Sequence, residues 1–110
     1  MDARNDILMT TSDDVPGRSV VKVLGLVRGN SVRARSIGRD IQALGRTIVG
    51  GRVGVYAELL EESRQDALDK MLEEAHALGA NAVVTTRLST SAIMSGAAEV
   101  LAYGTAVELE

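Results

Sequence analysis

The clearest pattern in the chain is a long amphipathic segment in its second half. Apolar side chains recur there at helical spacing, and Glu, Asp and Gln fill most positions between them. This pattern predicts a helix over residues 53–78, followed by a left-handed cap at Gly79, because glycine tolerates that backbone conformation. The apolar stripe consists of Tyr56, Leu60, Ala67, Met71, Ala75 and Leu78.

Several shorter segments have the composition of strands. Residues 7–11 are typical of a short edge strand, and residues 19–27 are apolar at both alternating sets of positions, as in a strand covered on both faces. Gly25 and Gly29 indicate a bulge or a close approach of another backbone. Two further strands are predicted over residues 81–88 and 98–109, joined by a Ser-rich connection over residues 89–97.

A short helix is predicted between the first long strand and the long helix. Ser36 can cap it, residues 37, 41 and 44 are apolar on one side, and Gly45 can end it. Gly50 and Gly51 are then expected to let the chain reverse before the long helix.

The order of these elements predicts one α+β domain over residues 7–110, preceded by a disordered N-terminus over residues 1–6. The subunit is a β-α-β-β unit of two layers, a sheet and a helix. One helix covers one face of a sheet, yet the strands are apolar on both faces. The second face therefore needs a partner, and another copy of the chain is the simplest one, so we expect a homo-oligomer.

Composition narrows the possible functions. The 110 residues include no Cys, one His, no Phe or Trp and two Tyr, so thiolate chemistry is excluded and aromatic platforms for bases are scarce. The net charge of −3 argues against a nucleic-acid binder, and no apolar run is long enough for a signal peptide or a membrane span. We expect a cytoplasmic protein with no membrane or nucleic-acid partner.

Charge is nevertheless divided along the chain. Residues 28–52 hold six Arg and one acid, and residues 58–74 hold seven acids against one Arg and one Lys. Opposite patches of this kind set orientation and register, so the two segments are predicted to meet within or between subunits. A functional anion site is the alternative.

That alternative site would lie at the start of the long helix. Gly50, Gly51 and Arg52 precede its N-terminus, where free amides and the helix dipole favour an anion, although paired glycines also form plain hinges. Arg64 falls near the middle of the apolar stripe, where a charge must be paired, placed at an interface or extended to solvent. With Arg52 and Tyr56 it could line a cavity for a small anionic ligand, and Asp40 could hold one of these arginines.

No motif predicts catalysis, a cofactor or a resident metal. Residues 45–50 have the glycine spacing of a phosphate loop, but Gly51 and Arg52 stand where Lys and Ser or Thr are required. Glu73 and His76 form a single Glu-x-x-His element on the outer helix face, whereas di-iron sites need two such elements and two further Glu. A metal, if bound, would be a hard ion held by carboxylates, because soft metals need thiolate or imidazole ligands. We therefore expect a non-enzymatic protein.

A set of short motifs in fixed order resembles the YbjQ-like family of small uncharacterised bacterial and archaeal proteins, whose domain is labelled as heavy-metal-binding. The resemblance spans residues 7–107. It implies a β-α-β-β subunit, as in dodecin-like proteins, that assembles into a ring of five, and it brings no catalytic residues. The motifs that carry it are Gly25, Gly29, Arg39-Asp40, Val49-Gly50-Gly51-Arg52, Tyr56, Leu60, Arg64, Ala75, the segment 78–84 and the segment 104–107.

Overall fold

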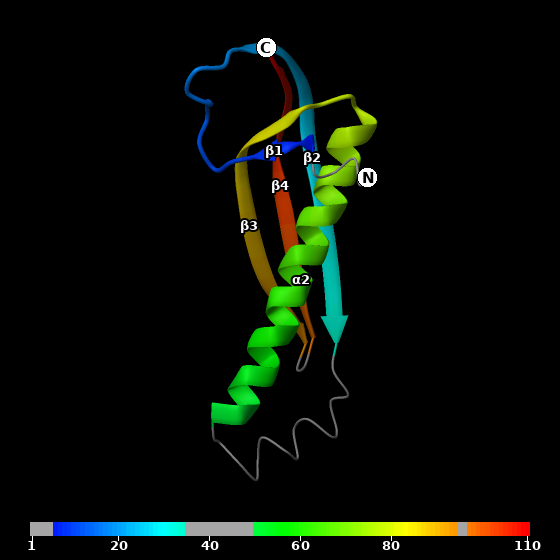
Figure 1. Cartoon of the computed structure of the whole chain (residues 1–110). Coiled ribbons are helices and arrows are strands. Elements are labelled where there is room, and N and C mark those ends of the chain that lie inside the picture. The colour runs from blue at the N-terminus through cyan, green and yellow to red at the C-terminus, as the bar shows by residue number, and fades with distance from the viewer. Residues whose placement is uncertain (1–5, 35–49, 95–96) are drawn as a thin grey trace.

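The computed structural model describes residues 6–34, 50–94 and 97–110 (Figure 1). Within them the chain forms one long helix and four strands. Their bounds are β1 (Leu8–Met9), β2 (Val20–Ala34), α2 (Gly50–Ala77), β3 (Ala82–Met94) and β4 (Ala97–Leu109). Apart from Asp6, the predicted disordered terminus lies outside the described residues, as does the short helix predicted over residues 36–44.

The strands form one mixed sheet in the order β1-β3-β4-β2. The pairs β3–β4 and β2–β4 are antiparallel, and the short β1 lies parallel to the first residues of β3. The helix α2 crosses one face of this sheet diagonally, so the molecule has two layers (Figure 1). The predicted β-α-β-β unit is confirmed, and β1 confirms the short edge strand predicted over residues 7–11.

The core lies between α2 and the sheet. Ala67, Met71 and Ala75 are completely buried on the helix, and they belong to one cluster with Val27 and Val100 of the sheet. Small residues on the helix let it approach the strands closely, and Met71 fills the space between them. The predicted apolar stripe is therefore confirmed at its centre. It is wrong at Leu78, which lies beyond the last helical residue and is 46% exposed.

Two glycines of β2 serve the roles that their positions predict. Gly25 has a φ of 129° and lies at a break in the register with β4, as expected for a bulge. Gly29 faces the helix, where a Cβ atom would lie only 2.7 Å from the Cβ of Lys70 and still closer to helix backbone atoms. The close contact between β2 and α2 thus depends on a residue without a side chain. Gly79 has a φ of 83°, which confirms the predicted left-handed cap after the helix.

The predicted connection over residues 89–97 is wrong. β3 continues to Met94 and β4 begins at Ala97, with Ser89 opposite Leu101 and Thr90 opposite Val100. Small polar residues are compatible with a strand when a neighbouring strand supplies the hydrogen bonds, and local composition alone does not reveal that neighbour. For the same reason β2 extends seven residues beyond the predicted end at Val27.

The predicted chain reversal at Gly50 and Gly51 is also wrong, because both residues are helical and α2 begins at Gly50. Glycine disfavours a helix interior by about 1 kcal/mol relative to alanine, which a helix of 28 residues can absorb. Only the backbone is described for residues 50–56.

Among the described residues, the second face of the sheet is covered mainly at one end. At one end Val15, from the loop before β2, packs against a small cluster of Ala82, Val84, Val107 and Leu109. Val23, which is opposite Val107 beside this cluster, and Leu26 and Val32 farther along β2 are 65%, 64% and 56% exposed. Their partners across β4 lie on the face opposite the helix, since directly opposed residues of antiparallel strands share a face. We call this uncovered surface the open sheet face.

Candidate functional site

The residues predicted to form an anion site are only partly described. Gly50, Gly51 and Arg52 lie in the first turn of α2, and Tyr56 follows one turn later. The side chains of Arg52 and Tyr56 are outside the described residues, and so is Asp40. The predicted cavity for a small anion therefore stays a prediction.

Arg64 does not lie in the apolar stripe. It is exposed, and the neighbouring Ser63 occupies the buried helix position with 1% exposure. The Ser63 hydroxyl donates a hydrogen bond to the carbonyl oxygen of Leu59, 2.9 Å away, which makes burial of a small polar residue acceptable. The stripe thus passes through Ser63. Arg64 is exposed in the single chain, so its pairing across a subunit interface and its role in an anion site stay predictions.

A cluster of polar groups joins α2 to β2. The carboxylate of Asp66 lies 3.1 Å from Lys70 Nζ and 3.9 Å from Arg33 Nη2. Lys70 Nζ also donates to the carbonyl oxygen of Asn30 at 3.1 Å. Hydrogen bonds from Ser31 and Lys70, with the nearby charges of Lys70 and Arg33, lower the pKa of Asp66 below its usual value. The predicted meeting of the basic and acidic segments therefore occurs within the chain at Arg33 and Asp66.

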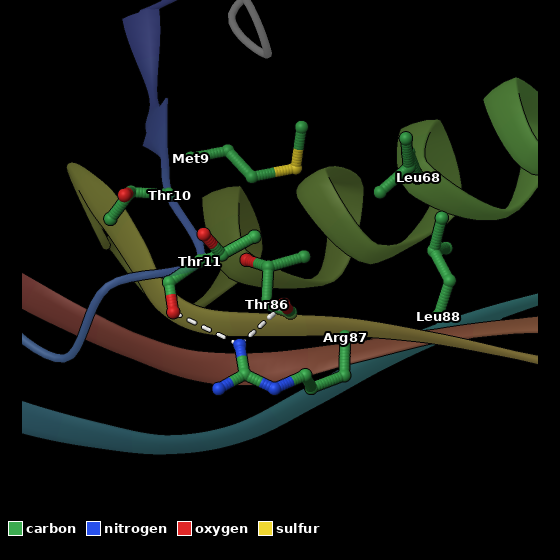
Figure 2. A pocket seen from close by; sticks show the side chains of 7 residues that line it. All are labelled: Met9, Thr10, Thr11, Leu68, Thr86, Arg87 and Leu88. Atoms are coloured by element: carbon green, nitrogen blue, oxygen red, sulfur yellow. Dashed lines mark hydrogen bonds between the residues drawn. The ribbon is translucent and has the colours of Figure 1, made fainter.

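A shallow hollow of about 390 Å³ lies where β1, β3 and α2 meet (Figure 2). The side chains of Met9, Leu68 and Thr86 lie on the side of β3 that faces the helix, whereas the Arg87 side chain extends on the other side (Figure 2). The hollow has a mainly apolar lining and suits an apolar group rather than a reacting one. It is lined by Met9, Thr10, Thr11, Leu68, Thr86, Arg87 and Leu88.

Thr86 carries a buried hydroxyl for which the described structure provides no hydrogen-bond partner. The residue is 6% exposed and lies at the irregular part of β3, between Val84 and Arg87, where the register with β4 shifts. Its own carbonyl oxygen, together with that of Thr11, accepts hydrogen bonds from Arg87 Nη1 at 3.0 and 2.9 Å. Arg87 therefore ties the chain after β1 to β3.

A row of three residues crosses the open sheet face. Arg28 of β2 is directly opposite Tyr103 of β4, which is directly opposite Arg87 of β3. Sequence patterns did not reveal this row, because the bulges in β2 and β3 change which positions face outward. The alternation of inward and outward positions along each strand could have revealed the row, but only if the shifts at Gly25 and after Val84 had been allowed for.

The family label of a metal-binding domain finds no support in the described donor groups. They include no group of three or more His, Asp or Glu side chains placed to hold a metal ion. His76, the only histidine, is exposed near the C-terminal end of α2. The described residues therefore do not fit a resident metal. Among them, no helix is long and apolar enough to cross a membrane.

Comparison with known proteins agrees with the family resemblance. The chain is 52% identical over 104 residues to UPF0145 proteins of Archaeoglobus fulgidus and Thermotoga maritima, with 94% of this chain and 96% and 98% of those proteins covered. A crystal structure of a protein of unknown function from Pediococcus pentosaceus, assigned to the DUF74 family, matches with a TM-score of 0.62 at 15% identity, over 94% of this chain and 98% of that one. This likeness shows the shared fold. Residues 7–110 match the family model described as "YbjQ_1: Putative heavy-metal-binding", so the chain belongs to the YbjQ family.

Proposed function

We propose that the protein is a non-enzymatic subunit of a closed homo-oligomer, a ring in which the open sheet face of each copy is covered by another. Five subunits is the number that the family resemblance implies. The observation that carries the proposal is the exposure of Val23, Leu26 and Val32 on a sheet whose other face is covered by α2.

The energetic argument is the cost of leaving this face in water. Each large aliphatic side chain gains about 1.5–3 kcal/mol on full burial, so several half-exposed ones on one surface favour association. Arg28 and Asn30 lie between Leu26 and Val32 on this face, and such a mixture of exposed apolar and polar residues is typical of protein interfaces. The edge of β2 also favours association. Within the described residues β2 pairs only with β4, so the backbone groups along its other edge are available to another strand.

The proposed non-enzymatic role is supported by what the described polar side chains do. The described polar side chains are engaged mainly in holding elements together, as Asp66 and Arg87 are. A ring of this kind would act through its assembled surface.

Paired substitutions can test which face associates. Leu26→Ser places a hydroxyl on the open sheet face, and Leu88→Ser makes the same change on the helix side of β3, at a residue 45% exposed. Light scattering after size exclusion should show a smaller species for Leu26→Ser and the wild-type mass for Leu88→Ser. Dissociation by Leu88→Ser alone would place the interface at the hollow and contradict the proposal.

A further inference from the structure

Two arginines lie on the open sheet face, and a partner that covers this face must also compensate their charges. Arg28 and Arg87 flank Tyr103 in one row across three adjacent strands. Neighbouring strands are about 4.8 Å apart, so the two arginine backbones are separated by about 10 Å. Leu26, 64% exposed, lies on the same face two residues before Arg28. A partner that covers the apolar residues therefore also covers two positive charges.

Within the chain these charges are only partly compensated. Arg28 is exposed and shares a hollow of about 370 Å³ with Glu74 and Glu99, yet no ion pair joins it to either residue in the described structure. Glu99 Oε2 instead accepts a hydrogen bond from Asn30 Nδ2 at 3.2 Å. Arg87 uses one nitrogen, Nη1, for its two bonds to carbonyl oxygens, and a guanidinium has five donors in all. Both arginines therefore have donors left for a hydrogen bond to a carboxylate of a partner.

An acidic surface of matching size lies on the outer side of α2. Glu58, Glu61, Glu62 and Gln65 line one hollow of about 320 Å³, and all four are exposed. From Glu58 to Gln65 the helix rises about 10 Å, the same length as the arginine row. We call this surface the acidic helix patch.

Resting on the proposed homo-oligomer, we propose that the acidic helix patch of a second copy of this chain docks on the Arg28–Tyr103–Arg87 row. The carboxylates neutralise the two arginines as the face is desolvated, which an apolar partner cannot do. Each copy presents both the row and the patch, so the contact is head to tail and leaves every subunit able to bind two neighbours. Contacts of this kind close into a ring when the rotation between neighbours closes and form an open filament when it does not, so the proposed ring requires a closing rotation.

A charge-reversal cycle tests the pairing. Arg28→Glu should raise the subunit dissociation constant about tenfold or more, and so should the double variant Glu61→Lys/Glu62→Lys, because each places like charges across the contact. All three changes in one chain restore opposite charges at residue 28, although Arg87 still faces lysine, so the combined variant should bind more tightly than either reversal alone. Arg18→Glu and Asp14→Lys, reversals at exposed sites outside the row and the patch, should leave the dissociation constant unchanged. Sedimentation velocity measures the constants, and far-UV circular dichroism verifies that each variant is folded.

The outcomes separate this inference from the proposed function. A wild-type chain that is monomeric at every concentration overturns both. A wild-type oligomer unaffected by either reversal overturns the docking and leaves the homo-oligomer standing. Weakening by both reversals without recovery in the combined variant also overturns the pairing. Weakening by each, with recovery when they are combined, is the result that the pairing predicts.

Discussion

Gly29 of β2 lies against the backbone of Ala67 on α2, with no room for a side chain between them. A Cβ atom at Gly29 would overlap the Ala67 carbonyl oxygen and the Met71 amide nitrogen, both of which are helix backbone and cannot rotate away. We predict that Gly29→Ala lowers the free energy of unfolding by about 1–3 kcal/mol, the usual cost of overpacking. Urea unfolding measures the change. Ser89→Ala, at an exposed position of β3, serves as the control and should leave stability within about 0.5 kcal/mol.

The unpartnered hydroxyl of Thr86 should reduce stability. Thr86→Val keeps the branched shape and removes a buried polar group, so the free energy of unfolding should rise by about 1 kcal/mol. Thr85→Val makes the same change one residue earlier, where the hydroxyl donates to Asp13 Oδ1 at 2.8 Å, and it should lower stability. A loss of stability in Thr86→Val would mean that this hydroxyl has a partner after all.

The cluster around Asp66 predicts a dependence on pH. Because Ser31, Lys70 and Arg33 lower the pKa of Asp66 in the folded protein, its contribution is fully present above the unfolded value near 3.8 and is lost as the pH falls below that value. Asp66→Asn should therefore be less stable than the wild type at pH 6, and the difference should shrink at acidic pH. Thermal unfolding between pH 6 and pH 2.5 measures it. A difference that does not vary with pH would exclude the ionised carboxylate as its source.

Metal ions should have little effect on stability. The described carboxylates do not converge in groups of three, and the chain has no cysteine. A ligand that binds only the folded state stabilises it by RT ln(1 + [L]/Kd), so the melting temperature rises with the logarithm of the ligand concentration above Kd. Melting curves with Zn²⁺, Mg²⁺ or a chelator should thus coincide with those of the untreated protein. A melting temperature that rises with the concentration of one of these ions and falls back when the chelator is added would support the metal-binding label.

The long helix, its buried stripe, the cap after it and the bulge in β2 could be predicted from the sequence. The stripe through Ala67, Met71 and Ala75 has the period of a helix and is buried as predicted, because tertiary packing and local pattern agree there. The cap at Gly79 and the bulge at Gly25 could be predicted because both glycines have positive φ angles, which other residues avoid. In each case one local physical requirement determines the result.

The features that the sequence did not predict depend on contacts between residues far apart in the chain. The Ser-rich part of β3 is a strand because β4 pairs with it, and composition does not encode that pairing. Helical spacing from Leu60 allows either residue 63 or residue 64 in the stripe, and only the fold shows that Ser63 is buried with its hydroxyl bonded to the Leu59 carbonyl oxygen. The arginine row depends on two bulges that shift the strand phase, so Arg28 and Arg87 emerge as neighbours of Tyr103 only in three dimensions.

The measurement that tests the central claim most directly is the native mass spectrum of the untagged wild-type chain. The proposal predicts a single dominant species at an integer multiple of the 11.6 kDa subunit, with five as the multiple that the family resemblance implies. The species should persist on dilution to low micromolar concentration, as expected for an interface that covers an apolar face. A spectrum containing only the 11.6 kDa monomer would contradict the claim that another copy covers the open sheet face.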